Sequence, residues 1–105
     1  MEKPNLTYVD ALSRGDVLVK KNLIEIIKSE FVLEQKEYYK SLKNADFKEI
    51  EANVHKIKHK ISILGFIKRY KLANDFEHNL RGHNLIGLKD FDKTLTVISE
   101  YLKII

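Results

Sequence analysis

Residues 55–65, HKIKHKISILG, contain two histidines among three lysines and three isoleucines and are the segment of this chain best suited to carry out chemistry. His55 and His59 are four residues apart, so on an α-helix their imidazoles lie one turn apart on one face. The core-facing residues of the segment fall on the opposite side, which predicts that both imidazoles face solvent. An exposed neutral imidazole is a competent nucleophile near neutral pH, because histidine in water has a pKa of about 6.5.

The lysines of this segment suggest which electrophile the imidazole would attack. Lys58 follows His55 by three residues, so we expect its ammonium to lie at the edge of the same face and to reach an anion bound there. Lys56 and Lys60 raise the local positive potential further. Phosphoryl transfer asks little of a protein beyond positioning and charge stabilisation. His55 is therefore a candidate phosphoryl acceptor, with Lys58 stabilising the phosphoryl charge.

The face that carries the two histidines is unusual in composition for a solvated helix face. Small and apolar residues replace the usual lysine, glutamate and glutamine, and we expect these to dock a partner protein: Ala52, Ser62, Ile63, Gly65 and Phe66. Apolar area around an imidazole, with cations at the edge, is typical of an interaction surface. The alternative reading of Gly65 is a glycine that only serves helix packing.

Apolar periodicity predicts the helices that position this segment. Residues 47–64 have apolar side chains at spacings of three and four, which predicts one helix with Asp46 as its N-cap. A similar stripe predicts a helix over 70–81 that ends at Gly82. A third stripe predicts a last helix that Asp90 caps and that runs to the end of the sequence.

The N-terminal part of the chain completes the predicted fold. The segment from Asp16 to about Lys43 contains no breaker and predicts one long helix. Thr7 is expected to cap a short first helix, with Val9 and Leu12 facing inward. Short connections favour antiparallel neighbours. The sequence therefore predicts an all-α fold, an antiparallel up-down four-helix bundle with a short additional N-terminal helix, in a single domain over residues 1–105.

Composition excludes several classes of protein. The chain has 105 residues and no cysteine, which excludes disulfides, thiolate metal sites and a cysteine nucleophile. No apolar run approaches the roughly 20 residues of a membrane span, and no signal segment follows the first residues, so we expect a cytoplasmic protein without membrane contact. The formal charge of +4 is the difference between 19 lysine and arginine residues and 15 acidic residues, which are interspersed along the chain. A nucleic-acid partner is not expected, because such proteins usually show a concentrated basic stripe.

The stretch from Val54 to Phe66, VHKIKHKISILGF, resembles the signature of histidine-containing phosphotransfer (HPt) domains, the shuttles of multistep phosphorelays. That signature has a histidine, a lysine three residues later, then a small residue, and a Leu-Gly pair nine and ten residues after the histidine. His55, Lys58 and the pair Leu64-Gly65 match in identity and register. The resemblance covers roughly residues 7 to 103.

The resemblance implies a fold and a function. The family's fold is an antiparallel four-helix bundle with the motif on its second helix. His55 would attack the aspartyl phosphate of a receiver domain through Nε2 and pass the phosphoryl group to a second receiver aspartate. The expected partners are receiver domains of response regulators and of hybrid histidine kinases. Magnesium belongs to the receiver, so we expect no cofactor, no metal and no kinase activity in this chain.

His59 departs from the family, which usually has glycine at that position. A histidine there could narrow the approach of a receiver, donate a hydrogen bond to the phosphoryl group, or tune the pKa of His55. One alternative function is an adaptor that docks receiver or kinase domains through the same face without being phosphorylated. Another is a small helical protein that binds nucleic acid or metal, since His55 and His59 have zinc-ligand spacing. Glu77 and His78 are candidates for further ligands only if their helix packs alongside.

Overall fold

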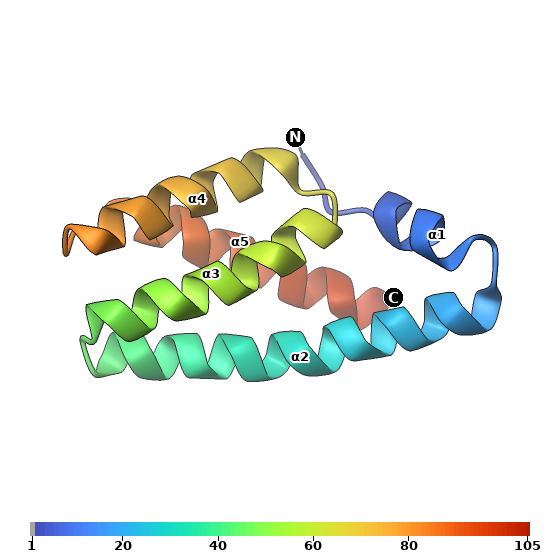
Figure 1. Ribbon diagram of the computed structural model, residues 1–105, viewed down its shortest axis with the longest axis horizontal. Coiled ribbons are helices and arrows are strands. Elements are labelled where there is room, and N and C mark those ends of the chain that lie inside the picture. The colour runs from blue at the N-terminus through green and yellow to red at the C-terminus, as the bar shows by residue number, and fades with distance from the viewer. Residues whose placement is uncertain (1) are drawn as a thin grey trace.

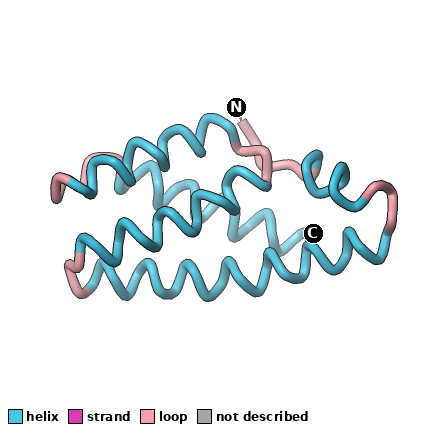
Figure 2. The backbone as a smooth tube through the Cα atoms, in the orientation of Figure 1, coloured by secondary structure: helices cyan, strands magenta, loops and turns pink. Residues whose placement is uncertain are grey.

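The computed structural model describes residues 2–105, and over these residues the chain forms five helices and no strand. The chain forms α1, α2, α3, α4 and α5 in the order Thr7–Ser13, Val17–Lys43, Phe47–Ile63, Ile67–Arg81 and Leu88–Ile104 (Figure 1). Loops are confined to short connections between helices and to the N-terminal segment (Figure 2). The predicted all-α class is confirmed. No helix in this described part of the chain combines the length and the apolar character needed to cross a membrane.

Aspartate side chains cap the N-termini of α2 and α3, as the sequence predicts for Asp46. The Asp16 carboxylate accepts hydrogen bonds from the backbone N–H groups of Leu18 and Val19, at 3.0 and 3.1 Å. Asp46 accepts one from the N–H of Glu49, at 3.2 Å. Each carboxylate satisfies donors that the first helical turn leaves without partners. These caps fix where α2 and α3 begin.

The starts of α1 and α5 differ from the prediction. Thr7 is the first residue of α1 and not its cap, since Leu6 occupies the N-cap position. The N–H of Thr7 donates to the side-chain oxygen of Asn5 at 3.1 Å. α5 begins at Leu88, so Asp90 lies inside the first turn and does not cap it. Gly87 precedes this helix with a left-handed φ of 103°. A sequence pattern predicts the first residue of a helix only to within one or two residues, because helix ends fray.

Neighbouring helices lie side by side along the long axis of the molecule. α3 packs between α2 and α4, and α5 lies behind α3 in the view of Figure 1 and contacts α4. The helix α1 covers the N-terminal end of α2. α3 is therefore braced on two flanks, while its remaining face is left for the residues of the candidate site.

The core is one cluster to which all five helices contribute. The fully buried side chains of α3 are those of its predicted stripe: Ile50, Val54, Ile57 and Ile61. Phe47 is half-buried at the start of that stripe. Val9 is buried as predicted, but Leu12 is half exposed, so the prediction that both face inward is wrong for Leu12. The short α1 makes its main helix–helix contact with α2, so only one side of α1 is buried.

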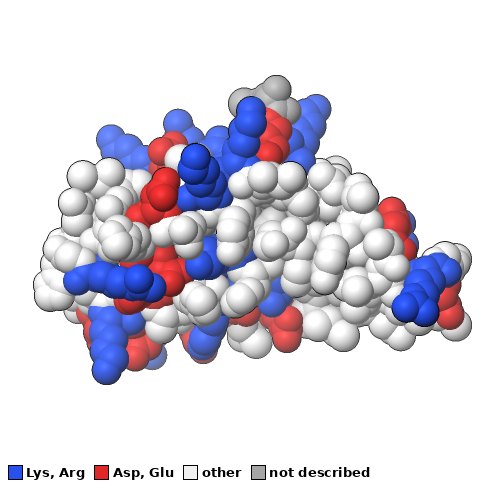
Figure 3. Space-filling model, turned by 45° about the horizontal axis from the view of Figure 1, so that its top comes forward, with Lys and Arg blue, Asp and Glu red and all other residues white. Residues whose placement is uncertain are grey.

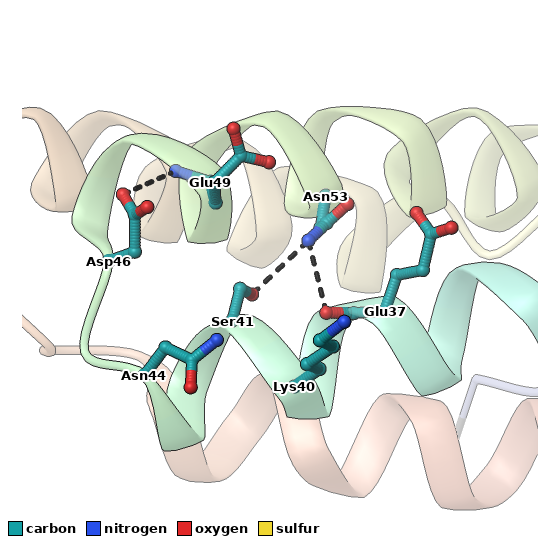
Figure 4. Close-up of a pocket in the computed structure, with 7 residues that line it drawn as sticks. All are labelled: Glu37, Lys40, Ser41, Asn44, Asp46, Glu49 and Asn53. Carbon is teal, nitrogen blue, oxygen red and sulfur yellow. Dashed lines mark hydrogen bonds between the residues drawn. The ribbon is translucent and has the colours of Figure 1, made fainter.

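Polar contacts also fix the spacing of α2 and α3. The buried Asn53 side chain donates to the backbone oxygen of Glu37 and to the Ser41 hydroxyl, both at 3.2 Å (Figure 4). These bonds lie beside a hollow of about 230 Å³ near the α2–α3 turn. Because Asn53 is two residues before His55, its bonds to α2 hold one side of α3 while the other side carries the imidazole.

The N-terminal segment is fastened to the turn between α3 and α4. The Asn5 N–H donates to the backbone oxygen of Leu64 at 2.7 Å. The Glu2 carboxylate accepts from the N–H groups of Lys68, at 2.9 Å, and of Arg69, at 3.1 Å, at the start of α4. The negative charge is favourable at this helix N-terminus. This segment therefore stabilises the turn that sets α4 against α3.

Candidate functional site

His55 lies in the middle of α3, and its side chain is about half exposed, as the sequence predicts. Its Nδ1 atom is 3.2 Å from both carboxylate oxygens of Glu77, on the neighbouring helix α4. One edge of the imidazole is therefore held by the protein. The opposite edge, with Nε2, is left for a reaction partner.

Glu77 is a buried carboxylate that joins three cationic or polar groups. Oε1 is 3.0 Å from Nζ of Lys58, and Oε2 is 3.3 Å from Nη2 of Arg81. Burial alone would raise the pKa of the Glu77 carboxyl, but the hydrogen bond and charge of Lys58, followed by those of His55, outweigh it. The pKa of Glu77 lies below its ordinary value, so this carboxyl is ionised at neutral pH.

The ionised Glu77 decides which nitrogen of His55 is nucleophilic. A carboxylate can only accept hydrogen bonds, so Nδ1 of His55 must be the donor. In the neutral imidazole the proton then resides on Nδ1 and the lone pair on Nε2. The nitrogen that faces away from Glu77 is thus the basic one, in the tautomer that a nucleophile at Nε2 requires.

Lys58 lies elsewhere than the sequence predicts. It is buried between α3 and α4, where its Nζ also donates to Oδ1 of Asn74 at 3.0 Å and lies 5.6 Å from the centre of the Tyr70 ring. We expected it at the exposed edge of the His55 face. The reason for the difference is the buried carboxylate of Glu77, which needs a cation beside it to remain ionised.

Lys60 also differs from the expectation that it adds to the potential around His55. It is buried on the α2 side of the helix, with Nζ 3.0 Å from Oε1 of Glu30 and 3.4 Å from Oε2 of Glu34. Its charge is neutralised there. Lys56, in contrast, is exposed and lies next to His55.

A hollow of about 440 Å³ opens at the surface beside His55. It is lined by one small residue, two lysines, two glutamates and the imidazole: Lys48, Glu51, Ala52, His55, Lys56 and Glu77. The Glu51 carboxylate accepts a hydrogen bond from Nε of Arg81 at 3.0 Å, so Arg81 offsets its negative charge. The cations in the lining of the hollow itself are the two lysines. An anionic group could approach His55 from this side.

His59 contacts His55 on the other flank, one turn further along α3. The two ring centres are 5.0 Å apart and the ring planes are perpendicular. Both side chains are exposed. The structure therefore confirms that the two imidazoles share one face of the helix, and it shows in addition that they touch edge to face.

The predicted docking residues are only in part on this face. Ala52 and Ser62 are exposed and Ile63 is half-buried, but Phe66 is buried, so its prediction as a docking residue is wrong. α3 ends at Ile63, and the chain turns before Phe66, whose ring enters the core. A helical projection carried beyond the true end of the helix cannot place that ring.

Gly65 forms part of the turn and is half-buried. Its φ of 69° is left-handed, and a Cβ there would lie 2.6 Å from the side chain of Asn5. The backbone conformation and the close approach of Asn5 account for a glycine at this position without any partner. Its part in docking stays a prediction.

Charged side chains are unevenly spread over the surface. Figure 3 shows a broad area without lysine, arginine, aspartate or glutamate to the right of centre, over the end of α3 and α1. Tyr8 and Leu12 of α1 and Ile67 at the start of α4 are exposed apolar side chains. A broad area without charged side chains is typical of an interaction surface.

Glu77 belongs to the candidate site, although no sequence pattern connects it with His55. The sequence predicts it only as a metal ligand on condition that its helix packs alongside α3; the helix does so, and Glu77 binds Nδ1 of His55. A signal was present in the sequence: Glu77 falls within the apolar stripe of Ala73, Phe76 and Leu80, where a charge needs a partner. Residues 2–105 contain no cluster of three or more His, Asp or Glu side chains arranged to hold a metal ion.

Comparison with known proteins returned no similarity: no family model, no curated protein and no solved structure matches this chain.

Proposed function

We propose that this chain is a histidine phosphotransfer protein of a phosphorelay, which accepts a phosphoryl group from a receiver-domain aspartate onto His55 and passes it to another receiver aspartate. The observation that carries the proposal is the bond between Nδ1 of His55 and the ionised Glu77. It orients an exposed imidazole with its lone pair on Nε2. The match of His55, Lys58, Leu64 and Gly65 to the HPt signature supports the same function.

The proposed transfer is a displacement at phosphorus. The Nε2 lone pair of His55 forms the N–P bond while the bond between phosphorus and the aspartate oxygen breaks, and that electron pair leaves with the aspartate carboxylate. The imidazole becomes cationic as the N–P bond forms, because it keeps its proton on Nδ1. Glu77 accepts the hydrogen bond from Nδ1 and stabilises this charge, as a buried carboxylate does for a catalytic histidine. The reverse reaction with a second receiver returns His55 to its starting state.

The receiver supplies the rest of the chemistry in this proposal. Its acidic pocket holds the magnesium ion that neutralises the phosphoryl oxygens, so the HPt protein contributes a nucleophile and a surface. Lys48 and Lys56 line the hollow beside His55, and their positive charges support the attraction of a receiver through its acidic pocket. This chain would have no kinase activity of its own.

We also propose that α2, α3, α4 and α5 form the antiparallel up-down four-helix bundle of that family, with α1 as the additional helix. Support comes from the short connections between consecutive helices and from the side-by-side packing of α3 with α2 and α4. In this arrangement the phosphoryl acceptor lies on the second helix of the bundle.

The proposal is tested by transfer of radiolabelled phosphate from a phosphorylated receiver domain to the purified chain. The wild-type chain should become labelled with an acid-labile phosphate, and His55→Gln should not, while its circular dichroism and melting temperature stay unchanged. His78→Gln, which removes another exposed histidine, is the matched control and should be labelled normally. Labelling of His55→Gln would refute the assignment, and receiver binding without any labelling would favour the adaptor function.

A further inference from the structure

We propose that His59 contacts the phosphoryl group carried by His55 and supplies the hydrogen bond that the HPt resemblance assigns to Lys58. This inference rests on the proposed function and names a further residue of the same site. It concerns the position at which this chain departs from the HPt signature, where the family usually has glycine.

Lys58 is poorly placed for that role in this chain. Its side chain is 9% exposed, and its ammonium already binds Glu77 and Asn74 between α3 and α4. To reach an anion on the solvent side, the Lys58 ammonium would have to move away from Glu77. The buried carboxylate would then lose one of the cations that stabilise it. Breaking a buried ion pair in this way is strongly unfavourable. The contribution of Lys58 is then to keep Glu77 ionised beneath His55.

His59 is in the right place to take over the contact. Its ring touches the His55 ring, with 5.0 Å between the centres and the planes perpendicular, and both side chains lie on the exposed face of α3. A phosphoryl group on Nε2 projects from the His55 edge that faces away from Glu77. Its three oxygens extend beyond the ring, within reach of an imidazole that already contacts that ring. An imidazole N–H, neutral or protonated, can donate to such an oxygen.

The other cations near His55 are less suited to a fixed contact. Lys48 and Lys56 line the hollow on the other flank, as long side chains on the surface of α3. Ordering a lysine against one oxygen costs the side-chain entropy of four torsions, and a histidine with two torsions has less to lose. We assign to these lysines the long-range attraction of an acidic partner, and to His59 the direct hydrogen bond.

The consequence is thermodynamic. The hydrogen bond exists only when His55 carries the phosphoryl group, so it stabilises the phosphorylated chain relative to the unphosphorylated one. His59 would shift the transfer equilibrium with a receiver toward the phosphorylated HPt protein. A chain with glycine at this position lacks this contribution.

The test measures the equilibrium constant for transfer between a phosphorylated receiver and the chain, by quantifying label on both proteins at equilibrium. His59→Ala should lower the constant by about three- to tenfold, the effect of one exposed charge-assisted hydrogen bond. His59→Gln keeps an N–H donor and should retain most of the wild-type value, which a merely structural role for the ring would not explain. His78→Ala is the matched control, and its constant should equal that of the wild type.

Two outcomes would overturn the inference while leaving the proposed function intact. One is an unchanged constant in His59→Ala with normal labelling of His55. The other is a larger loss in Lys56→Gln than in His59→Ala, which would give the contact to the lysine of the hollow. Absence of label on the wild-type chain would instead refute the proposed function, and this inference with it.

Discussion

Under the proposed function, the reactivity of His55 depends on Glu77, a carboxylate that is twenty-two residues away in the sequence and on another helix. Glu77 binds Nδ1 of His55, and Lys58 and Arg81 bind Glu77. Lys58, the lysine of the signature, would then act on His55 through Glu77. The most informative substitutions are those that remove the charge of Glu77 and preserve its shape.

Glu77→Gln should both slow phosphoryl transfer to His55 and destabilise the fold. The amide cannot neutralise the buried Lys58, and an uncompensated buried charge costs about 3 kcal/mol. Its NH₂ group can also turn toward Nδ1, which would move the lone pair of the imidazole away from Nε2. The measurements are the initial rate of labelling and the free energy of unfolding in urea at neutral pH. Asp10→Asn, which removes an exposed carboxylate that binds Lys20 between α1 and α2, is the control and should change both quantities little.

The contribution of Glu77 to stability should depend on pH in a defined direction. Its pKa in the folded chain is below the ordinary value of 4.5, so its stabilising effect is complete above that value. The effect is lost as the pH falls through the folded pKa. The difference in unfolding free energy between wild type and Glu77→Gln should therefore shrink when the pH is lowered from about 6 to about 3. A difference that grows on acidification would contradict this account of Glu77.

At the scale of the helices, the turn between α3 and α4 sets the distance between His55 and Glu77. Gly65 allows this turn, since its φ is left-handed and Asn5 leaves no space for a Cβ. Asn5 and Glu2 then fasten the N-terminal segment to the end of α3 and the start of α4. A small change in this turn should therefore be felt at the site.

Gly65→Ala should destabilise the fold by about 2 kcal/mol, from the left-handed φ and from displacement of Asn5. Gly15→Ala is the matched control, because Gly15 has a similar φ of 81° but no atom within 4 Å of the added Cβ. It should cost only the backbone term, about 1 kcal/mol. Chemical denaturation of both variants measures the difference. Equal losses would show that the contact with Asn5 contributes nothing.

Local patterns were enough to predict most of the helices and the exposure of His55. The spacing of Ile50, Val54, Ile57 and Ile61 defines a buried stripe, and Asp16 and Asp46 are strong caps. The same projection failed for Phe66, because the end of α3 depends on the turn that follows. It also misplaced Lys58 and did not pair Glu77 with Lys58 or His55, since these pairings are tertiary contacts between two helices that no single-helix pattern encodes.

At the scale of the whole molecule, the candidate site is an exposed imidazole on the outside of a helical scaffold and not an enclosed cavity. The structure measures 44 by 26 by 19 Å, and the hollow at His55 lies open to the surface. The uncharged area over the end of α3 and α1 lies on the face shown in Figure 3. Under the proposed function, a partner covers His55 during transfer and supplies the metal ion and the acidic pocket that holds it.

The central claim is that Nε2 of His55 is the atom that receives the phosphoryl group. It is tested most directly by phosphorylating the chain with a receiver domain and magnesium, and locating the phosphoryl group by phosphorus–nitrogen NMR couplings together with fragmentation mass spectrometry. We predict one phosphoryl group, on Nε2 of His55. A group on Nδ1 of His55, on His59, or on no histidine would contradict the account.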